Sequence, residues 1–98
     1  MRYGLLKSLL AKHIVQNTRL AYCHVDRVLA IEGKQAILTA LVKTLNDRIM
    51  HWFIETTWET DAYGTHKILT YKILKEDELD GYPQGNESLQ ADSKGLFA

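Results

Sequence analysis

Four histidines and one cysteine are the side chains of this chain best suited to chemistry at neutral pH: His13, His24, His51, His66 and Cys23. A structural zinc site needs paired ligands at short spacings, and only Cys23 and His24 are close in sequence. Neighbouring residues point in different directions on either a helix or a strand. A reactive cysteine needs an electropositive, partly exposed setting, and a buried thiol is inert. The pattern predicts a structural thiol and no metal site.

His51 and Glu55 could form an acid–base pair, because they lie on the same face of a predicted strand. The residues expected opposite this face, Thr70 and Lys72, favour a ladder of structural polar pairs instead. No glycine-rich phosphate-binding loop is present. We therefore expect no catalytic residue, no cofactor site and no enzymatic activity.

A β-hairpin is the clearest structural signal. Residues 49–59 and 66–75 are rich in β-branched and aromatic side chains, and turn-forming residues lie between them. Alternate positions of each strand form an apolar face: Met50, Trp52, Ile54, Thr56 and Trp58 on the first, and Leu69, Tyr71 and Ile73 on the second.

A single register keeps this apolar face intact. It places Trp52 opposite Ile73, Ile54 opposite Tyr71, Thr56 opposite Leu69 and Trp58 opposite Lys67. The four-residue loop 61–64 then forms a type I turn. A three-residue loop with Gly64 in a bulge is the alternative, but in this register it would split the apolar face.

The chain before the hairpin reads as helical. A first buried stripe has helical spacing: Leu6, Leu9, Leu10, His13 and Ile14. A second lies within 34–47: Leu38, Leu41, Val42 and Leu45. Residues 19–32 fit either a helix or a strand, and Gly33 ends that element. The resulting fold class is α+β, with two or three N-terminal helices packed on a C-terminal antiparallel hairpin.

The domain organisation is simple. Ninety-eight residues form one domain, assigned to residues 1–78. Residues 79–98 contain the only proline with several glycines and read as a flexible acidic tail. No apolar run is long enough to span a bilayer. The single cysteine excludes an internal disulfide and fits a reducing, cytoplasmic setting.

Charge is uneven although the formal net charge is zero. The first 25 residues contain four basic residues and no acid. This basic amphipathic start resembles a mitochondrial presequence, but continuity with the next element favours a folded helix. Four acids follow the second hairpin strand: Glu76, Asp77, Glu78 and Asp80. They either keep the tail solvated or bind a partner that has a basic surface.

Two functions fit these features. The first is a small protein–protein interaction module, a regulator, adaptor or inhibitor that occupies a partner's surface, with aromatic residues suited to binding. A homodimer through the hairpin is a further expectation, unless a strand from 19–31 covers the hairpin's edge. The alternative is a winged helix-turn-helix nucleic-acid binder, in which the helix 34–47 presents four residues to DNA: Gln35, Thr39, Lys43 and Asn46.

Overall fold

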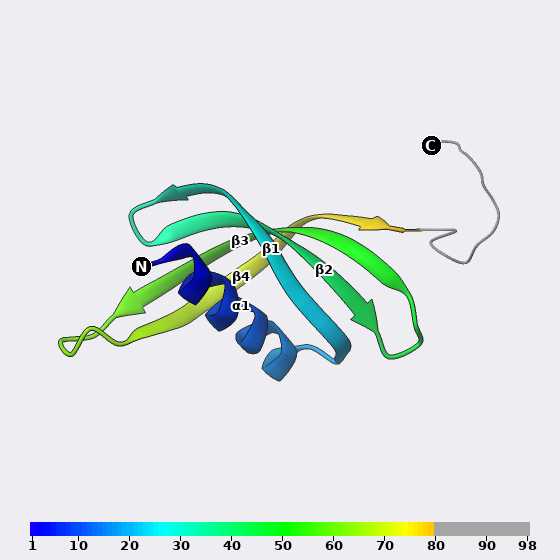
Figure 1. Cartoon of the computed structure of the whole chain (residues 1–98), viewed down its shortest axis with the longest axis horizontal. Coiled ribbons are helices and arrows are strands. Elements are labelled where there is room, and N and C mark those ends of the chain that lie inside the picture. Colours follow the sequence, from blue (N-terminus) through cyan, green and yellow to red (C-terminus); the bar gives the residue numbers. More distant parts are fainter. Residues whose placement is uncertain (80–98) are drawn as a thin grey trace.

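The computed structural model describes residues 1–79, which form one helix followed by four strands (Figure 1). The elements are α1 (Tyr3–Asn17), β1 (Leu20–Glu32), β2 (Gln35–Thr44), β3 (Ile49–Thr60) and β4 (His66–Glu78). The strands form an antiparallel sheet in the order β1-β2-β3-β4. The predicted tail, apart from Leu79, lies outside the described residues, as does Asp80.

The first helix is confirmed. Leu6, Leu10 and Ile14 are fully buried and face the sheet, as their helical spacing predicts. At the C-terminal end of the helix the side-chain amide of Asn17 donates a hydrogen bond to the backbone carbonyl of His13 over 2.7 Å. Thr18 is already extended, with φ −140 and ψ 138, so the chain passes directly into β1.

The expectation of further helices is wrong, because 19–32 and 34–47 form the strands β1 and β2. In β2 the even positions Ala36, Leu38, Ala40 and Val42 are all buried, which is the period of two that a strand requires. Leu41 is also apolar but lies on the opposite face of the strand. Its spacing of three residues from Leu38 is what made the segment resemble one face of a helix. Leu45 would belong to that helical stripe, yet it lies in the next turn and is 62% exposed. The fold is therefore one helix on a four-stranded sheet.

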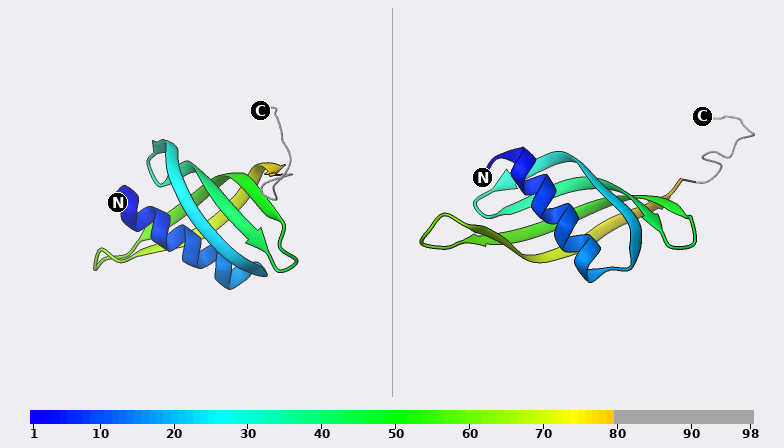
Figure 2. Two further views of the ribbon diagram at one scale, coloured as in Figure 1. Left: turned by 45° about the vertical axis from the view of Figure 1, so that its right-hand side comes forward. Right: turned by 60° about the horizontal axis from the view of Figure 1, so that its bottom comes forward.

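The hairpin strands are confirmed, and so is the buried face of β3. Trp52, Ile54, Thr56 and Trp58 are each less than 5% exposed. Trp52, Ile54 and Trp58 belong to the hydrophobic core that includes the α1 residues Leu6, Leu10 and Ile14. The predicted packing of two or three helices on the hairpin is therefore wrong, because α1 is the one described helix and covers this face (Figure 2).

The predicted hairpin register is wrong, because the loop is the alternative that was rejected. The Gly64 amide donates to the Asp61 carbonyl over 3.1 Å, and the Asp61 amide donates to the Thr65 carbonyl over 3.0 Å. Gly64 has φ 82, the left-handed conformation of a three-residue loop that ends in a glycine bulge. The strand pairing accordingly starts with Thr60 opposite His66.

Two bulges in β4 explain why this loop does not split the apolar face. Trp58 pairs with Ile68, Thr56 with Tyr71, Ile54 with Ile73 and Trp52 with Glu76. The unpaired extra residues are Leu69 and Leu74, and each advances the register by one position. The buried positions of β3 thus keep neighbours on the same side. Leu69 itself is 47% exposed, and its predicted place in the buried face is wrong.

The sheet is longer than the helix that covers it. A helix of 15 residues spans about 22 Å, whereas a strand of 13 residues spans about 43 Å. The helix lies on one side of the sheet (Figure 2), and no described element covers the other side. The inner edge of the hairpin, at β3, is covered by β2 and not by 19–31. The edges of the described sheet are β1 and β4.

Candidate functional site

The side of the sheet opposite α1, called the outer face here, is covered by none of the described elements. It consists of the odd positions of β2 and β3 and their cross-strand partners on β1 and β4. Three consecutive rows cross its centre, each given from β1 to β4: His24, Leu41, His51, Asp77; then Arg27, Thr39, Phe53, Lys75; then Ala30, Ile37, Glu55, Lys72.

The centre of the outer face is apolar. Ile37, Leu41 and Phe53 lie on the two central strands and are partly exposed. The His51 ring packs edge-on against Phe53, with 5.1 Å between the centroids and an angle of 88° between the planes. Antiparallel sheets with one solvated face usually alternate apolar and polar residues, so apolar residues at these outward positions indicate a contact surface.

Charged and polar residues surround this centre. The Lys75 ammonium lies 5.8 Å from the Phe53 ring centroid and 3.7 Å from an Asp77 carboxylate oxygen. The Glu55 carboxylate accepts a hydrogen bond from the side-chain amide of Gln35, and Glu55 lies opposite Lys72 on β4. Arg27 and Lys72 are exposed at the two sides. An apolar centre with a charged rim is the usual anatomy of a protein-binding surface.

The structure separates the acidic residues that the sequence grouped together. The Glu76 carboxylate accepts a hydrogen bond from the Trp52 indole over 2.7 Å. The Arg48 guanidinium donates hydrogen bonds to the Glu78 carboxylate, one of them over 3.0 Å. This hydrogen bonding holds the pKa of Glu78 below its ordinary value. Of the three described acids, 76–78, Asp77 alone lies on the outer face. Within the described part of the cluster, two of the three acids therefore contribute to the fold.

The residues of the proposed recognition helix have different positions from those expected. Gln35, Thr39 and Lys43 do share one face, but it is the outer face of the strand β2. Thr39 is 4% exposed, and its hydroxyl accepts a hydrogen bond from the Arg27 amide over 3.2 Å. Asn46 lies in the β2–β3 turn. The winged helix-turn-helix arrangement is thus wrong, because the helix that would enter the DNA groove is a strand.

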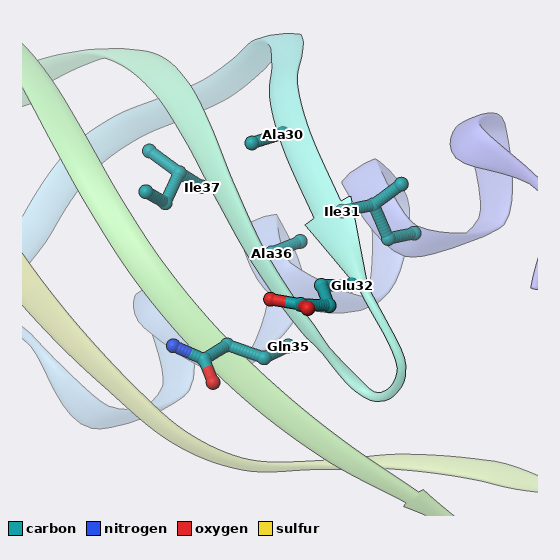
Figure 3. Close-up of a pocket in the computed structure, with 6 residues that line it drawn as sticks. All are labelled: Ala30, Ile31, Glu32, Gln35, Ala36 and Ile37. Atoms are coloured by element: carbon teal, nitrogen blue, oxygen red, sulfur yellow. The ribbon is translucent and has the colours of Figure 1, made fainter.

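A cleft of about 380 Å³ lies at the β1–β2 hairpin and is lined by Ala30, Ile31, Glu32, Gln35, Ala36 and Ile37 (Figure 3). Glu32 and Gln35 point to one side of the hairpin and Ile31 to the other. Ligand pockets usually combine an apolar wall with several converging polar groups. Glu32 is the only titratable residue that lines this cleft. The cleft therefore lacks the converging polar groups of a ligand pocket, and we treat it as part of the edge of the outer face.

The remaining chemistry-bearing side chains do not converge. Within residues 1–79 no group of three or more His, Cys, Asp or Glu side chains is placed to hold a metal ion. Cys23 is partly buried toward the core, and this burial raises the pKa of its thiol to about 11. His13 packs edge-on against Tyr71, with centroids 5.7 Å apart. These contacts have structural roles.

Comparison with known proteins finds no matching family model, no matching curated protein and no matching solved structure. The described part of the chain contains no helix with the length and apolar character needed to cross a membrane.

Sequence reasoning missed the outer face as a site. Ile37 and Leu41 fall within the predicted helix 34–47, and Phe53 lies between His51 and Glu55 on the hairpin face that is predicted to be a ladder of polar pairs. The signal was present in β2, where apolar residues occupy both the odd and the even positions of Gln35–Thr44. A strand that is apolar on both faces either lies inside a protein or contacts a partner.

Proposed function

We propose that this chain is a non-enzymatic protein-interaction module, a regulator, adaptor or inhibitor that occupies a partner's surface through the outer face. The carrying observation is the set Ile37, Leu41 and Phe53, three apolar side chains on central strands that no described layer covers. Apolar patches with a polar rim mark protein contacts more often than a solvated sheet surface. Removing this area from water supplies the main driving force for binding.

The rim supports the choice of a protein as partner. It combines basic residues (Arg27, Lys72, Lys75) with acidic ones (Glu55, Asp77), so the outer face has no strongly positive field. A nucleic-acid surface is usually strongly positive. Mixed charge gives specificity toward a complementary protein surface, with Asp77 available for a basic group of the partner. As part of this proposal the protein works in the cytoplasm, where the free thiol of Cys23 persists.

Site-directed photo-crosslinking in the native host tests this function. A benzoylphenylalanine replaces Phe53 at the centre of the outer face. The matched control places the same group at Tyr63, which is 94% exposed in the β3–β4 loop. We expect one dominant protein adduct from position 53, confirmed by mass spectrometry, that is missing from position 63.

Two outcomes would overturn the proposal. One is the same spread of weak adducts from both positions, which would show that the outer face has no preferred partner. The other is a nucleic-acid adduct from position 53 in place of a protein. Tyr22, His51 and Phe53 lie on the outer face and could stack on bases, so this second outcome is checked by nuclease treatment of the adduct.

A further inference from the structure

We propose that a second copy of this chain occupies the outer face. The two copies are related by a two-fold axis that lies between the two sheets and runs across the strands, along the row of Thr39 and Phe53. This inference rests on the proposed function, because it names the occupant of the same surface. An isologous interface requires a surface that is complementary to itself. The rows of the outer face meet this requirement about one particular axis.

The axis brings apolar residues together at the centre. The row that contains Thr39 and Phe53 meets its own copy, so that the two Phe53 rings lie against each other. The two flanking rows exchange places. Leu41, in the row on one side, therefore meets Ile37 of the second copy, in the row on the other side. The three partly exposed apolar residues thus all find apolar partners.

The same rotation pairs opposite charges. Asp77 lies in the Leu41 row and meets Lys72 of the second copy, which lies in the Ile37 row. The His51 ring meets the Glu55 carboxylate of the second copy, which is a hydrogen-bond acceptor. Each contact occurs twice because of the symmetry. An axis parallel to the strands would instead place Ile37 against Glu55 of the second copy, an apolar side chain against a carboxylate, which is unfavourable.

One row does bring like charges together. Arg27 and Lys75 lie on the edge strands in the row of the axis, so each faces its own copy. Both are long side chains at the rim, and such side chains extend their charged ends into water while their stems cover apolar area. Lys75 already lies close to Asp77. The central row therefore remains compatible with the axis.

The size of the outer face is sufficient for a reversible dimer. Five rows run along the outer face, the three named above and one at each end, which contain Lys43 with Ile49 and Gln35 with Thr57. Four strands about 4.8 Å apart and five rows about 7 Å apart give roughly 500 Å² of area per copy. The total buried surface is then about 1,000 Å², the lower limit for a specific interface. Two sheets stacked in this way resemble the inner faces of a β-sandwich.

Edge-to-edge pairing, the dimer expected from the hairpin, is disfavoured by the bulges. The strand β1 has register shifts at Ala21, Asp26 and Leu29, and β4 has them at Leu69 and Leu74. Bulges interrupt the row of free amides and carbonyls that a new strand would need, and natural proteins use them to prevent such pairing. The outer face contains the better-matched surface.

A charge exchange between positions 72 and 77 tests the arrangement by sedimentation equilibrium on the full chain. We expect a reversible dimer for the wild type. Asp77→Lys and Lys72→Asp should each raise the dimer dissociation constant at least tenfold, because each places like charges together at two sites. The double variant D77K/K72D should restore it to within about threefold. Lys34→Asp, the same change in the β1–β2 turn, is the matched control and should have no effect.

The outcomes separate this inference from the proposed function. A wild-type monomer at concentrations up to about 1 mM overturns the dimer, whatever the variants do. A dimer that neither single substitution weakens, or that the exchange does not restore, overturns the axis. If the chain is monomeric while position 53 crosslinks to a different protein, the proposed function stands and the second copy is excluded.

Discussion

At the scale of the residue, Cys23 illustrates how burial decides chemistry. It lies on β1 opposite Val42 and packs toward the core, and the loss of hydration raises the pKa of its thiol to about 11 from the ordinary 9.0. The nucleophile is the thiolate, so the folded protein contains very little of the reactive form at neutral pH. The neighbouring His24 points to the outer face and does not activate the thiol.

We predict that Cys23 reacts with Ellman's reagent at pH 8 at least tenfold more slowly in the native chain than in urea. Because the folded pKa is raised, this group contributes full stability below about pH 9, and the contribution falls between pH 9 and pH 11. The free energy of unfolding of wild type should therefore fall more steeply above pH 9 than that of Cys23→Ala. Equal thiol reactivity in the folded and unfolded chains would contradict this assignment.

At the scale of the element, threonines replace hydrogen bonds that the bulges remove. Next to the bulge at Leu69, the buried Thr56 hydroxyl donates to the Thr70 carbonyl over 2.8 Å. Next to the bulge at Asp26, the Thr39 hydroxyl accepts from the Arg27 amide. Buried polar groups need such partners. Side-chain hydrogen bonds thus stabilise the bulges of the two edge strands. This agrees with the role of bulges in protecting the edges of a sheet.

We expect Thr56→Val to lower the free energy of unfolding by about 1–2 kcal/mol, because the substitution keeps the shape but leaves the Thr70 carbonyl without this donor. Thr57→Val is the matched control on the same strand. Its hydroxyl bonds the exposed Thr70 hydroxyl, and an exposed site should change stability by less than about 0.5 kcal/mol. Urea denaturation measures both, and equal effects would refute the role of the bulge.

At the scale of the whole molecule, stability depends on the layer between α1 and the sheet. Ile54 is fully buried at the centre of β3, whereas its partner Ile73 is 39% exposed on the edge strand. The helix contacts both edge strands, and the shared hydrogen bond of Thr18 and Tyr71 links the end of α1 to β4. The helix and all four strands thus share one hydrophobic core.

We predict that Ile54→Ala lowers the free energy of unfolding by about 2–5 kcal/mol, the range for a buried side chain that leaves a cavity. Ile73→Ala should cost less than about half as much, since much of that side chain is already in water. The denaturant dependence should stay the same for both variants if unfolding remains two-state. A larger effect at Ile73 than at Ile54 would contradict the observed register.

The outer face is a property of the whole sheet, which explains why the sequence did not reveal it. Its centre combines Ile37 and Leu41 from β2 with Phe53 from β3, and its rim includes residues of β1 and β4. Once 34–47 was interpreted as a helix, Leu38 and Leu41 fell on one face. In the strand they fall on opposite faces, and only then does an apolar surface opposite the core become visible.

The first helix, the strands of the hairpin and the buried face of β3 are predictable from the residues, because each has a single dominant period. The sequence left 19–32 open between helix and strand, and it wrongly predicted a helix for 34–47, where leucines fit both periods and pairing with β3 settles the conformation. Nor did it determine the register, since the loop at Gly64 and the bulges at Leu69 and Leu74 each shift the pairing by one position. These features depend on long-range packing, because the gain from burying Trp52, Ile54 and Trp58 under α1 outweighs the local cost of an irregular edge strand.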